Sequence, residues 1–259
     1  MSSFPAGRAG CGDLRSRAAQ QDCRYLARWL LSTPRAGGTH SSFTRPRPVF
    51  VSGGGSNFKA LHKATLDGRV NGRITASALD LACCHPQQLT RPCLGCQVVV
   101  SDKADCGGVA YAQANGMRVL RYPAARDAPG DGLSAAQLVD TLREEGIHLV
   151  LLAGYLKLVP GELCRAFPRA MLNIHPALLP AFGGKGMYGH KVHAAVIASG
   201  ARFSGPTVHF VDEEYDRGKI VAQRCVPVLP DDSPDSLAHR VLEQARARCL
   251  ECVSVPVCG

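Results

Sequence analysis

Short apolar runs alternate with segments of helical spacing through the middle of this chain, and this rhythm restricts the fold more than any other feature. Val- and Leu-rich runs lie at residues 49–51, 98–101, 118–121 and 148–152. Strands that are buried on both faces of a sheet read as continuous apolar runs, and strand–helix alternation implies right-handed crossovers. We therefore predict an α/β fold with a mostly parallel, doubly wound sheet.

The helices between these runs are predicted from caps and apolar spacing. Ser56 or Asn57 is expected to cap a helix that ends near Leu66, and Ser134 is expected to cap one that ends near residue 146. Further helices are predicted at 108–115 and 233–248. A strand is predicted at 172–174, and the runs 207–211 and 220–228 are expected to form an antiparallel pair that extends the sheet.

The positive charge of the chain is concentrated at its N-terminus. Residues 1–48 contain eight arginines, no lysine and two acidic residues, so they carry +6 of the net charge of +9. An Arg- and Ser-rich, acid-poor N-terminus is typical of an organellar transit peptide. We predict that residues 1–47 are such a peptide, with a tail that carries no targeting signal as the alternative.

The remaining composition excludes several classes of protein. The body of the chain is nearly balanced in charge and has no basic helix with interleaved aromatic residues, so no nucleic-acid partner is expected. No apolar run is long enough to span a membrane. The twelve cysteines are scattered, which favours reduced thiols. The cluster of Cys83, Cys84, His85, Cys93 and Cys96 could hold zinc, but thiols in an irregular insertion are the simpler interpretation, and no metal is predicted.

A glycine-rich turn, Ser52 to Asn57, follows the first predicted strand and opens the first predicted helix. Free backbone N–H groups and the positive end of the helix dipole favour a phosphate at such a place. The turn matches neither the dinucleotide fingerprint nor the P-loop, and a tight turn without a ligand is the alternative.

Asn173 and His175 form the second candidate site, in the stretch Asn173-Ile174-His175-Pro176. Residues two apart on a strand face the same way, and Pro176 ends the strand where pockets of parallel sheets lie. An amide and an imidazole together can stabilise an oxyanion during acyl transfer. Asp216, in a loop beyond the run 207–211, is predicted to return to the sheet end and to keep the imidazole of His175 protonated.

These features in this order resemble glycinamide ribonucleotide formyltransferases of purine synthesis, and GGKGMYGHKVH resembles their plant branch. The stretches that carry the resemblance are VFVSGGGSN, VVVSDKADCGG, LVLLAGYLKLVP, MLNIHPALLPAFGGKG and SGPTVHFVDEEYDRGKIVAQRCVPV. The resemblance implies a Rossmann-like fold over a formyltransferase domain at 48–248, and a chloroplast location, with the mitochondrion as the alternative.

The resemblance also implies the reaction and the residues that carry it. The formyl group of 10-formyltetrahydrofolate, as cosubstrate, is expected to pass to the amine of N1-(5-phospho-D-ribosyl)glycinamide, so the expected partners are small molecules. The implied roles are a catalytic trio of Asn173, His175 and Asp216; phosphate binding by Gly55, Ser56 and Asn57; and folate binding by Arg126, by Leu156, Lys157, Leu158 and Val159, and by Asn173.

The chain departs from the family pattern at two places. Residues 72–97 form an atypical, cysteine-rich insertion, and 249–259 form an atypical tail. In the family the last helix carries a Glu-His pair whose Glu recognises the substrate amine, whereas Gln244-Ala245-Arg246 stands there in this chain. Two alternative functions follow, namely a 10-formyltetrahydrofolate hydrolase, which shares the catalytic trio, and a non-catalytic folate- or phosphate-binding relative.

Overall fold

The computed structural model describes residues 48–67, 98–124, 131–147 and 149–254. Its main sheet has seven strands in the order β3-β2-β1-β4-β5-β7-β8, and β6 and β9 pair separately. The main strands are β1 (Val49–Val51), β2 (Val98–Ser101), β3 (Arg118–Arg121), β4 (Val150–Leu152), β5 (Met171–His175), β7 (Thr207–Phe210) and β8 (Ile220–Gln223). The small pair consists of β6 (Phe203–Ser204) and β9 (Val226–Pro227). The helices are α2 (Ser56–Leu66), α4 (Gly107–Ala114), α5 (Ala135–Glu144), α6 (Gly161–Ala166), α7 (His190–Ala198) and α8 (Pro234–Ser254).

The strand directions confirm the predicted fold class. The strands from β3 to β5 run parallel to one another, whereas β7 is antiparallel to β5 and β8 is antiparallel to β7. The parallel part is built by strand–helix crossovers, and the antiparallel strands extend it at one edge.

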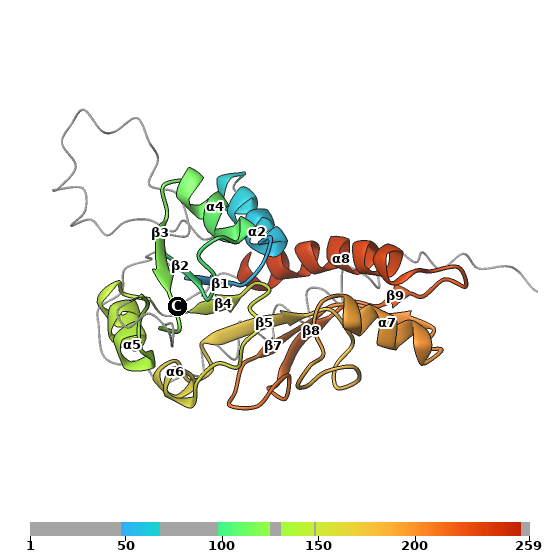
Figure 1. Ribbon diagram of the computed structural model, residues 1–259. Coiled ribbons are helices and arrows are strands. Elements are labelled where there is room, and N and C mark those ends of the chain that lie inside the picture. Colours follow the sequence, from blue (N-terminus) through green and yellow to red (C-terminus); the bar gives the residue numbers. More distant parts are fainter. Residues whose placement is uncertain (1–47, 68–97, 125–130, 148, 255–259) are drawn as a thin grey trace, which may run out of the picture.

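Helices cover both faces of the sheet, which explains the apolar runs. Val49 and Val51 belong to the core beneath α2 and α4, and Phe50 belongs to the core on the opposite face, with α5 and α6. Figure 1 shows α2, α4 and α8 on one side of the sheet and α5 and α6 on the other. Because every residue of β1 is buried against a helix layer, no polar alternation is needed.

Ser134 caps α5 as predicted. Its side chain accepts a hydrogen bond from the Gln137 backbone N–H, and the Gln137 side chain accepts one from the Ser134 N–H. This capping box satisfies two backbone donors at the helix start, and Leu138, Val139 and Leu142 form the buried face.

The C-terminal third differs from the prediction in three ways. The run 220–228 is two strands, because the chain leaves the main sheet after Gln223 and β9 pairs with β6. Helices α6 and α7 were not predicted; Val196 of α7 is buried in a cluster that includes Leu237 and Val241 of α8. Helix α8 also continues beyond residue 248, to Ser254.

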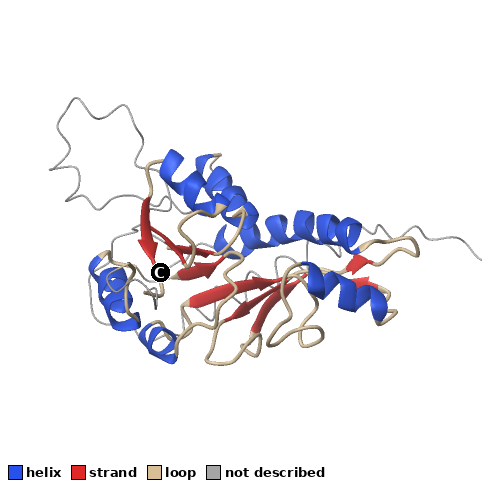
Figure 2. Cartoon of the chain, in the orientation of Figure 1, coloured by secondary structure: helices blue, strands red, loops and turns tan. Residues whose placement is uncertain are grey.

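The carboxyl ends of β1, β4 and β5 meet at one edge of the sheet and are followed by loops. Figure 2 shows the strands of the main sheet, the helices on both sides of it and the loops that join them. The backbone N–H of Ser52, after β1, donates to the carbonyl of Gly154, after β4, at 3.2 Å. The Ser52 hydroxyl accepts from the N–H of Leu156 at 3.2 Å, so one buried serine joins two of the loops.

The glycine-rich turn after β1 is pressed against the start of α4. Gly55 has a φ of +68°, and a Cβ placed on it would lie 2.9 Å from the Cα of Gly108. The N–H of Gly108 donates to the carbonyl of Gly53 at 3.0 Å. Gly55 is therefore required both by its backbone conformation and by the close approach of another backbone.

We predict that Gly55→Ala destabilises the protein by about 1–3 kcal/mol, because a side chain there combines a left-handed backbone with a steric clash. Gly53→Ala is the matched control, since a Cβ on Gly53 meets no atom within 4 Å. Urea unfolding of the three proteins measures the difference, and equal midpoints for the two variants would contradict the prediction.

Candidate active site

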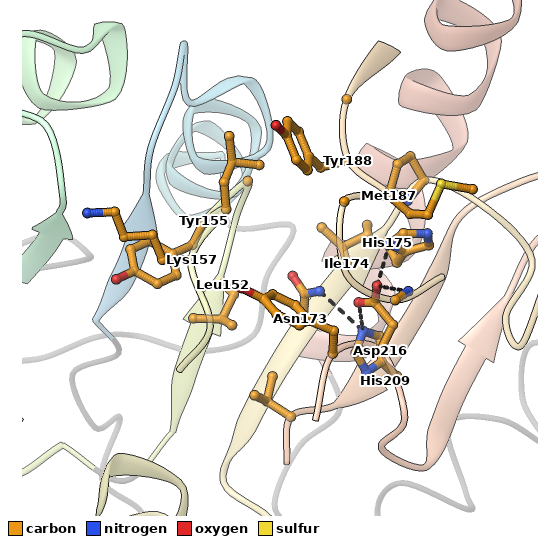
Figure 3. A pocket seen from close by; sticks show the side chains of 18 of the residues that line it. Leu152, Tyr155, Lys157, Asn173, Ile174, His175, Met187, Tyr188, His209 and Asp216 are labelled. Carbon is orange, nitrogen blue, oxygen red and sulfur yellow. Dashed lines mark hydrogen bonds and ion pairs between the residues drawn. The ribbon is translucent and has the colours of Figure 1, made fainter. Parts of the chain in front are cut away.

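A cavity of about 610 Å³ lies at the edge where the strands end. It is lined by residues after β4, the end of β5, the loop of residues 184–189, the first turn of α7, the loop after β7 and one face of α8. Figure 3 shows Asn173, His175, His209 and Asp216 together on one wall, with Tyr155 and Lys157 on the opposite side.

The pairing of β5 with β7 creates the polar wall. Asn173 lies opposite His209 and His175 lies opposite Thr207 in the antiparallel register. Cross-strand partners share a face, so all four side chains lie on the same side of the sheet. The predicted common orientation of Asn173 and His175 is confirmed, because both line the cavity.

Asp216 lies between two imidazoles, in the position that the sequence predicted for it. Its Oδ2 is 3.5 Å from Nδ1 of His175, and its Oδ1 is 3.5 Å from Nε2 of His209. The N–H of Gly184 donates to Oδ2 at 2.9 Å. Asp216 has a φ of 56°, a left-handed conformation that Asp tolerates better than most residues. The contacts with both rings and with the Gly184 N–H keep Asp216 in this conformation.

The loop after β5 closes around His175. Nε2 of His175 donates to the carbonyl of Phe182 at 2.8 Å. A Cβ on Gly183 would lie 2.5 Å from Leu179 and 3.2 Å from Cβ of Asp216. The absence of a side chain at Gly183 therefore lets the loop and Asp216 approach His175 together.

The expectation that Asp216 keeps His175 charged is corrected by the depth of the site. Burial lowers the pKa of His175, and although Asp216 and the Phe182 carbonyl raise it, the net pKa is below the ordinary value of 6.5. Only 4% of the His175 side chain is exposed, so the loss of water around a cation outweighs one carboxylate. At neutral pH the resting imidazole is uncharged.

Asp216 itself stays ionised. Burial raises its pKa, but the His209 imidazole, the Gly184 N–H and the nearby His175 outweigh burial, so the pKa lies below its usual value. The wall therefore combines a carboxylate with two imidazoles and an amide.

Asn57 brings the glycine-rich turn to the cavity. It lies in the first turn of α2, whose N–H groups have no partner within the helix, and its side chain lines the cavity. Its Oδ1 is buried and has no hydrogen-bond partner among the described residues. Gly55 and Ser56 directly precede it, so a phosphate at this helix end remains the prediction for all three.

The predicted folate contacts line the opposite side. Leu156, Lys157, Leu158 and Val159 all lie along the cavity. Leu156 and Leu158 are about half exposed, at 43% and 45%, which provides apolar surface at the mouth. The ammonium of Lys157 is 3.6 Å from Oδ2 of Asp102. Arg126 lies outside the described residues, and the roles of this whole set remain predictions.

Other parts of the earlier interpretation also fall outside the described residues, including the N-terminal segment 1–47 and the cysteine cluster between 83 and 96. Where the chain is described, no three His, Cys, Asp or Glu side chains are grouped as metal ligands. Within the same ranges no helix is long and apolar enough to cross a membrane.

The sequence assigned no role to two histidines of the cavity wall. His209 is 2% exposed and His193 is 5% exposed. Alternation along a strand puts Thr207 and His209 on one face, which is a signal for His209, but the residue opposite His209 becomes known only from the register. His193 and Ala245 lie on α7 and α8, and the packing of these helices brings them to the cavity.

The comparisons agree with this geometry. The family model described as "Formyl transferase" matches residues 87–253. The chain is 51% identical over 233 residues to "Phosphoribosylglycinamide formyltransferase, chloroplastic" from Arabidopsis thaliana, covering 88% of this chain and 72% of that protein. It is 54% identical over 205 residues to the protein of the same name from Vigna unguiculata, covering 79% of this chain and 58% of that one.

A solved structure shares the fold. The glycinamide ribonucleotide transformylase 1 of Symbiobacterium toebii superposes with a TM-score of 0.66 at 32% identity, covering 85% of this chain and 92% of that one. The chain therefore belongs to the formyl transferase family. Its relatives above half identity are phosphoribosylglycinamide formyltransferases of chloroplasts, and the chain spans less than two thirds of the length of the Vigna protein.

Three buried imidazoles predict how stability depends on pH. Burial lowers the pKa of His62, His175 and His193 below 6.5, so between the lowered and ordinary values the unfolded chain binds more protons than the folded one. The stability of the fold with these three imidazoles uncharged is fully present above the pKa of histidine in the unfolded chain. It is lost as the pH falls below that pKa and the unfolded chain takes up protons. We expect the midpoint of thermal unfolding to be lower at pH 5.5 than at pH 7.5.

Replacing His193 by Asn should reduce this difference in midpoint. His239→Asn is the control, because the side chain of His239 is 77% exposed. A midpoint that is unchanged, or that rises as the pH falls from 7.5 to 5.5, would contradict the assignment.

Proposed function

We propose that this protein transfers the formyl group of 10-formyltetrahydrofolate to the amine of N1-(5-phospho-D-ribosyl)glycinamide, in the synthesis of purines. The carrying observation is that Asn173, His175 and Asp216 converge on one wall of a cavity that also contains Asn57, at the start of α2. The identity of more than half to two phosphoribosylglycinamide formyltransferases supports the same reaction.

The phosphorylated substrate accounts for the glycine-rich turn. Backbone N–H groups at the start of α2 and the positive end of its dipole favour a phosphate dianion. We assign Gly55, Ser56 and Asn57 to this phosphate. The unpartnered Oδ1 of Asn57 gives the substrate a buried acceptor beside the phosphate position.

The folate donor accounts for the opposite side of the cavity. A pterin is a ring system with hydrogen-bonding groups along its edges, and the backbone of Leu156 to Val159 offers both donors and acceptors. We assign this segment, together with Asn173 and Arg126, to the donor. Leu156 and Leu158 provide apolar surface near the cavity mouth, where the remainder of the donor would leave the protein.

The reaction moves one formyl group from N10 of the folate to the amine and, overall, one proton from the amine to N10. The amine nitrogen attacks the formyl carbon, the carbonyl π electrons move to oxygen, and the bond from carbon to N10 of the folate then breaks. The attacking nitrogen loses a proton and N10 gains one. Nε2 of neutral His175 donates to the Phe182 carbonyl, so the ring can accept the first proton at Nδ1, where ionised Asp216 stabilises the imidazolium that forms. The imidazolium and the Asn173 amide stabilise the oxyanion while it exists.

A resting neutral imidazole suits this sequence of events. The cation appears beside the reacting carbon only when negative charge develops on the oxygen. Burial therefore lowers the affinity of His175 for a proton at rest without preventing the imidazolium from forming in the intermediate.

The proposed location and partners follow from the relatives. Both relatives above half identity are chloroplastic by name, and we propose that residues 1–47 of this chain direct it to the chloroplast. The proposed partners are the two small-molecule substrates, without nucleic acid, membrane or metal.

The function is tested by incubating the full 259-residue chain with both substrates and following tetrahydrofolate and formylated ribonucleotide. We expect equal formation of both products. His175→Ala should lower kcat by about 10²–10⁴-fold, as expected when a residue that transfers a proton is lost. His239→Ala should leave kcat unchanged. Folate binding without turnover would indicate a non-catalytic relative, and formate without formylated ribonucleotide would indicate a hydrolase.

The α8 wall of the cavity predicts weak recognition of the amine. Of the three residues at the position of the family's Glu-His pair, Ala245 is the one that lines the cavity, and it has no carboxylate to offer. Ala245→Glu should lower KM for the ribonucleotide by about 5- to 150-fold, which corresponds to the 1–3 kcal/mol of a charge-assisted hydrogen bond.

Two control variants separate charge and position from bulk. Ala245→Gln has the same shape without the charge, and Ala238→Glu places a carboxylate two turns earlier on the same cavity-lining face of α8. If all three variants change KM equally, recognition of the amine does not depend on a carboxylate at residue 245.

A further inference from the structure

His209 is a buried titratable residue on the cavity wall to which the proposed mechanism gives no role. Its side chain is 3% exposed, and each ring nitrogen has a partner among the described residues. Nδ1 lies 2.8 Å from the carbonyl of Phe210, and Nε2 lies 3.2 Å from Nδ2 of Asn173. Figure 3 shows the His209 ring joined to Asn173 and to Asp216.

The carbonyl of Phe210 fixes which ring nitrogen carries the proton. A carbonyl oxygen can only accept a hydrogen bond, so Nδ1 of His209 donates to it. In the neutral ring, Nε2 is then a bare acceptor, and the nearest donor to it is the amide nitrogen of Asn173. This hydrogen bond distinguishes the two ends of the Asn173 amide, since the carbonyl end placed against Nε2 would bring two acceptors together.

We propose that His209 is a positioning residue that fixes the orientation of the Asn173 amide. The proposal rests on the proposed function, because the amide acts there on the reacting formyl group. With one N–H held by Nε2, Asn173 keeps its carbonyl oxygen and its second N–H for the substrates. Without His209 the amide can rotate about its last bond and offer either end to the reacting atoms.

The pairing of β7 with β5 places His209 beside Asn173. The two residues are directly opposed in the β5–β7 register, and a bulge between Val208 and His209 lies at the same point on the other side of β7. Oδ1 of Asp216, at 3.5 Å from Nε2, lies beside this contact. Nε2 of His209 therefore lies beside both Asn173 and Asp216, and of these two only Asn173 has a hydrogen to donate to it.

Two substitutions separate positioning from packing. The terminal oxygen of a Gln side chain lies about as far from the backbone as Nε2 of histidine, so His209→Gln retains an acceptor for Asn173. The terminal nitrogen of an Asn side chain lies only about as far from the backbone as Nδ1 of histidine. His209→Asn therefore retains the hydrogen bond to the Phe210 carbonyl and loses the hydrogen bond to Asn173. We expect His209→Asn to lower kcat at least tenfold with both KM values within threefold, and His209→Gln to recover most of kcat.

A double-mutant cycle tests whether His209 acts through Asn173. In an Asn173→Ala background, His209→Asn should change kcat by less than twofold, because the group it orients is gone. Additive losses in the cycle, or equal losses in His209→Asn and His209→Gln, would overturn the proposal.

One measurement does not depend on turnover or on the stability of variants. The ¹⁵N NMR shifts of the His209 ring in the unsubstituted protein report which nitrogen is protonated. We expect a protonated Nδ1 and a bare Nε2 at neutral pH, and a protonated Nε2 overturns the proposal. Lack of turnover in the unsubstituted protein counts instead against the proposed formyl transfer, and leaves this readout intact.

Discussion

The antiparallel pairing of β7 with β5 is the contact from which the candidate site is built. It places His209 opposite Asn173 and Thr207 opposite His175, so four polar side chains meet on one face. Thr207 then holds the following loop, because its hydroxyl donates to the Ala177 carbonyl at 2.6 Å and accepts from the Leu179 N–H at 3.0 Å. A shift of one residue would turn every one of these side chains to the opposite face. The register therefore positions both the polar wall of the candidate site and the loop that follows β5.

The extent of burial influences which residues of this wall are charged. His175 is surrounded by acceptors, the Asp216 carboxylate and the Phe182 carbonyl, which favour a charged ring. Its pKa is nevertheless lowered, because nearly all of the side chain is out of water. Asp216 is less deeply buried and is contacted by the Gly184 N–H, so it remains charged where His175 does not. A neutral imidazole beside an ionised carboxylate is suited to accept a proton and hold it only while an oxyanion exists.

The backbone around the wall leaves little room for substitutions. Phe182, which accepts from His175, and Asp216 both have left-handed conformations, with φ of 55° and 56°. Gly183 lies so close to Leu179 and Asp216 that a side chain on it would displace one of them. On the far side of the cavity, Ser52 joins the glycine-rich turn to the loop after β4, so the predicted phosphate and folate contacts are held by one hydrogen-bonded unit. Sites of this kind are held by the backbone as much as by the side chains.

Local sequence patterns were enough to predict most of the secondary-structure elements and the candidate residues of the site. Continuous apolar runs identified β1, β2 and β4, because burial on both faces leaves no polar alternation, and Ser134 identified the start of α5 through its cap. Two-residue spacing put Asn173 and His175 on one face. Tertiary structure alone decided what depends on contacts between distant segments: the register that places His209 against Asn173, the packing of α8 that brings Ala245 to the cavity, and the departure of β9 from the main sheet. It also determined the direction in which the pKa of His175 is shifted. The Asp216 carboxylate is present in the sequence, but the exclusion of water from the His175 imidazole depends on how the whole fold closes over it.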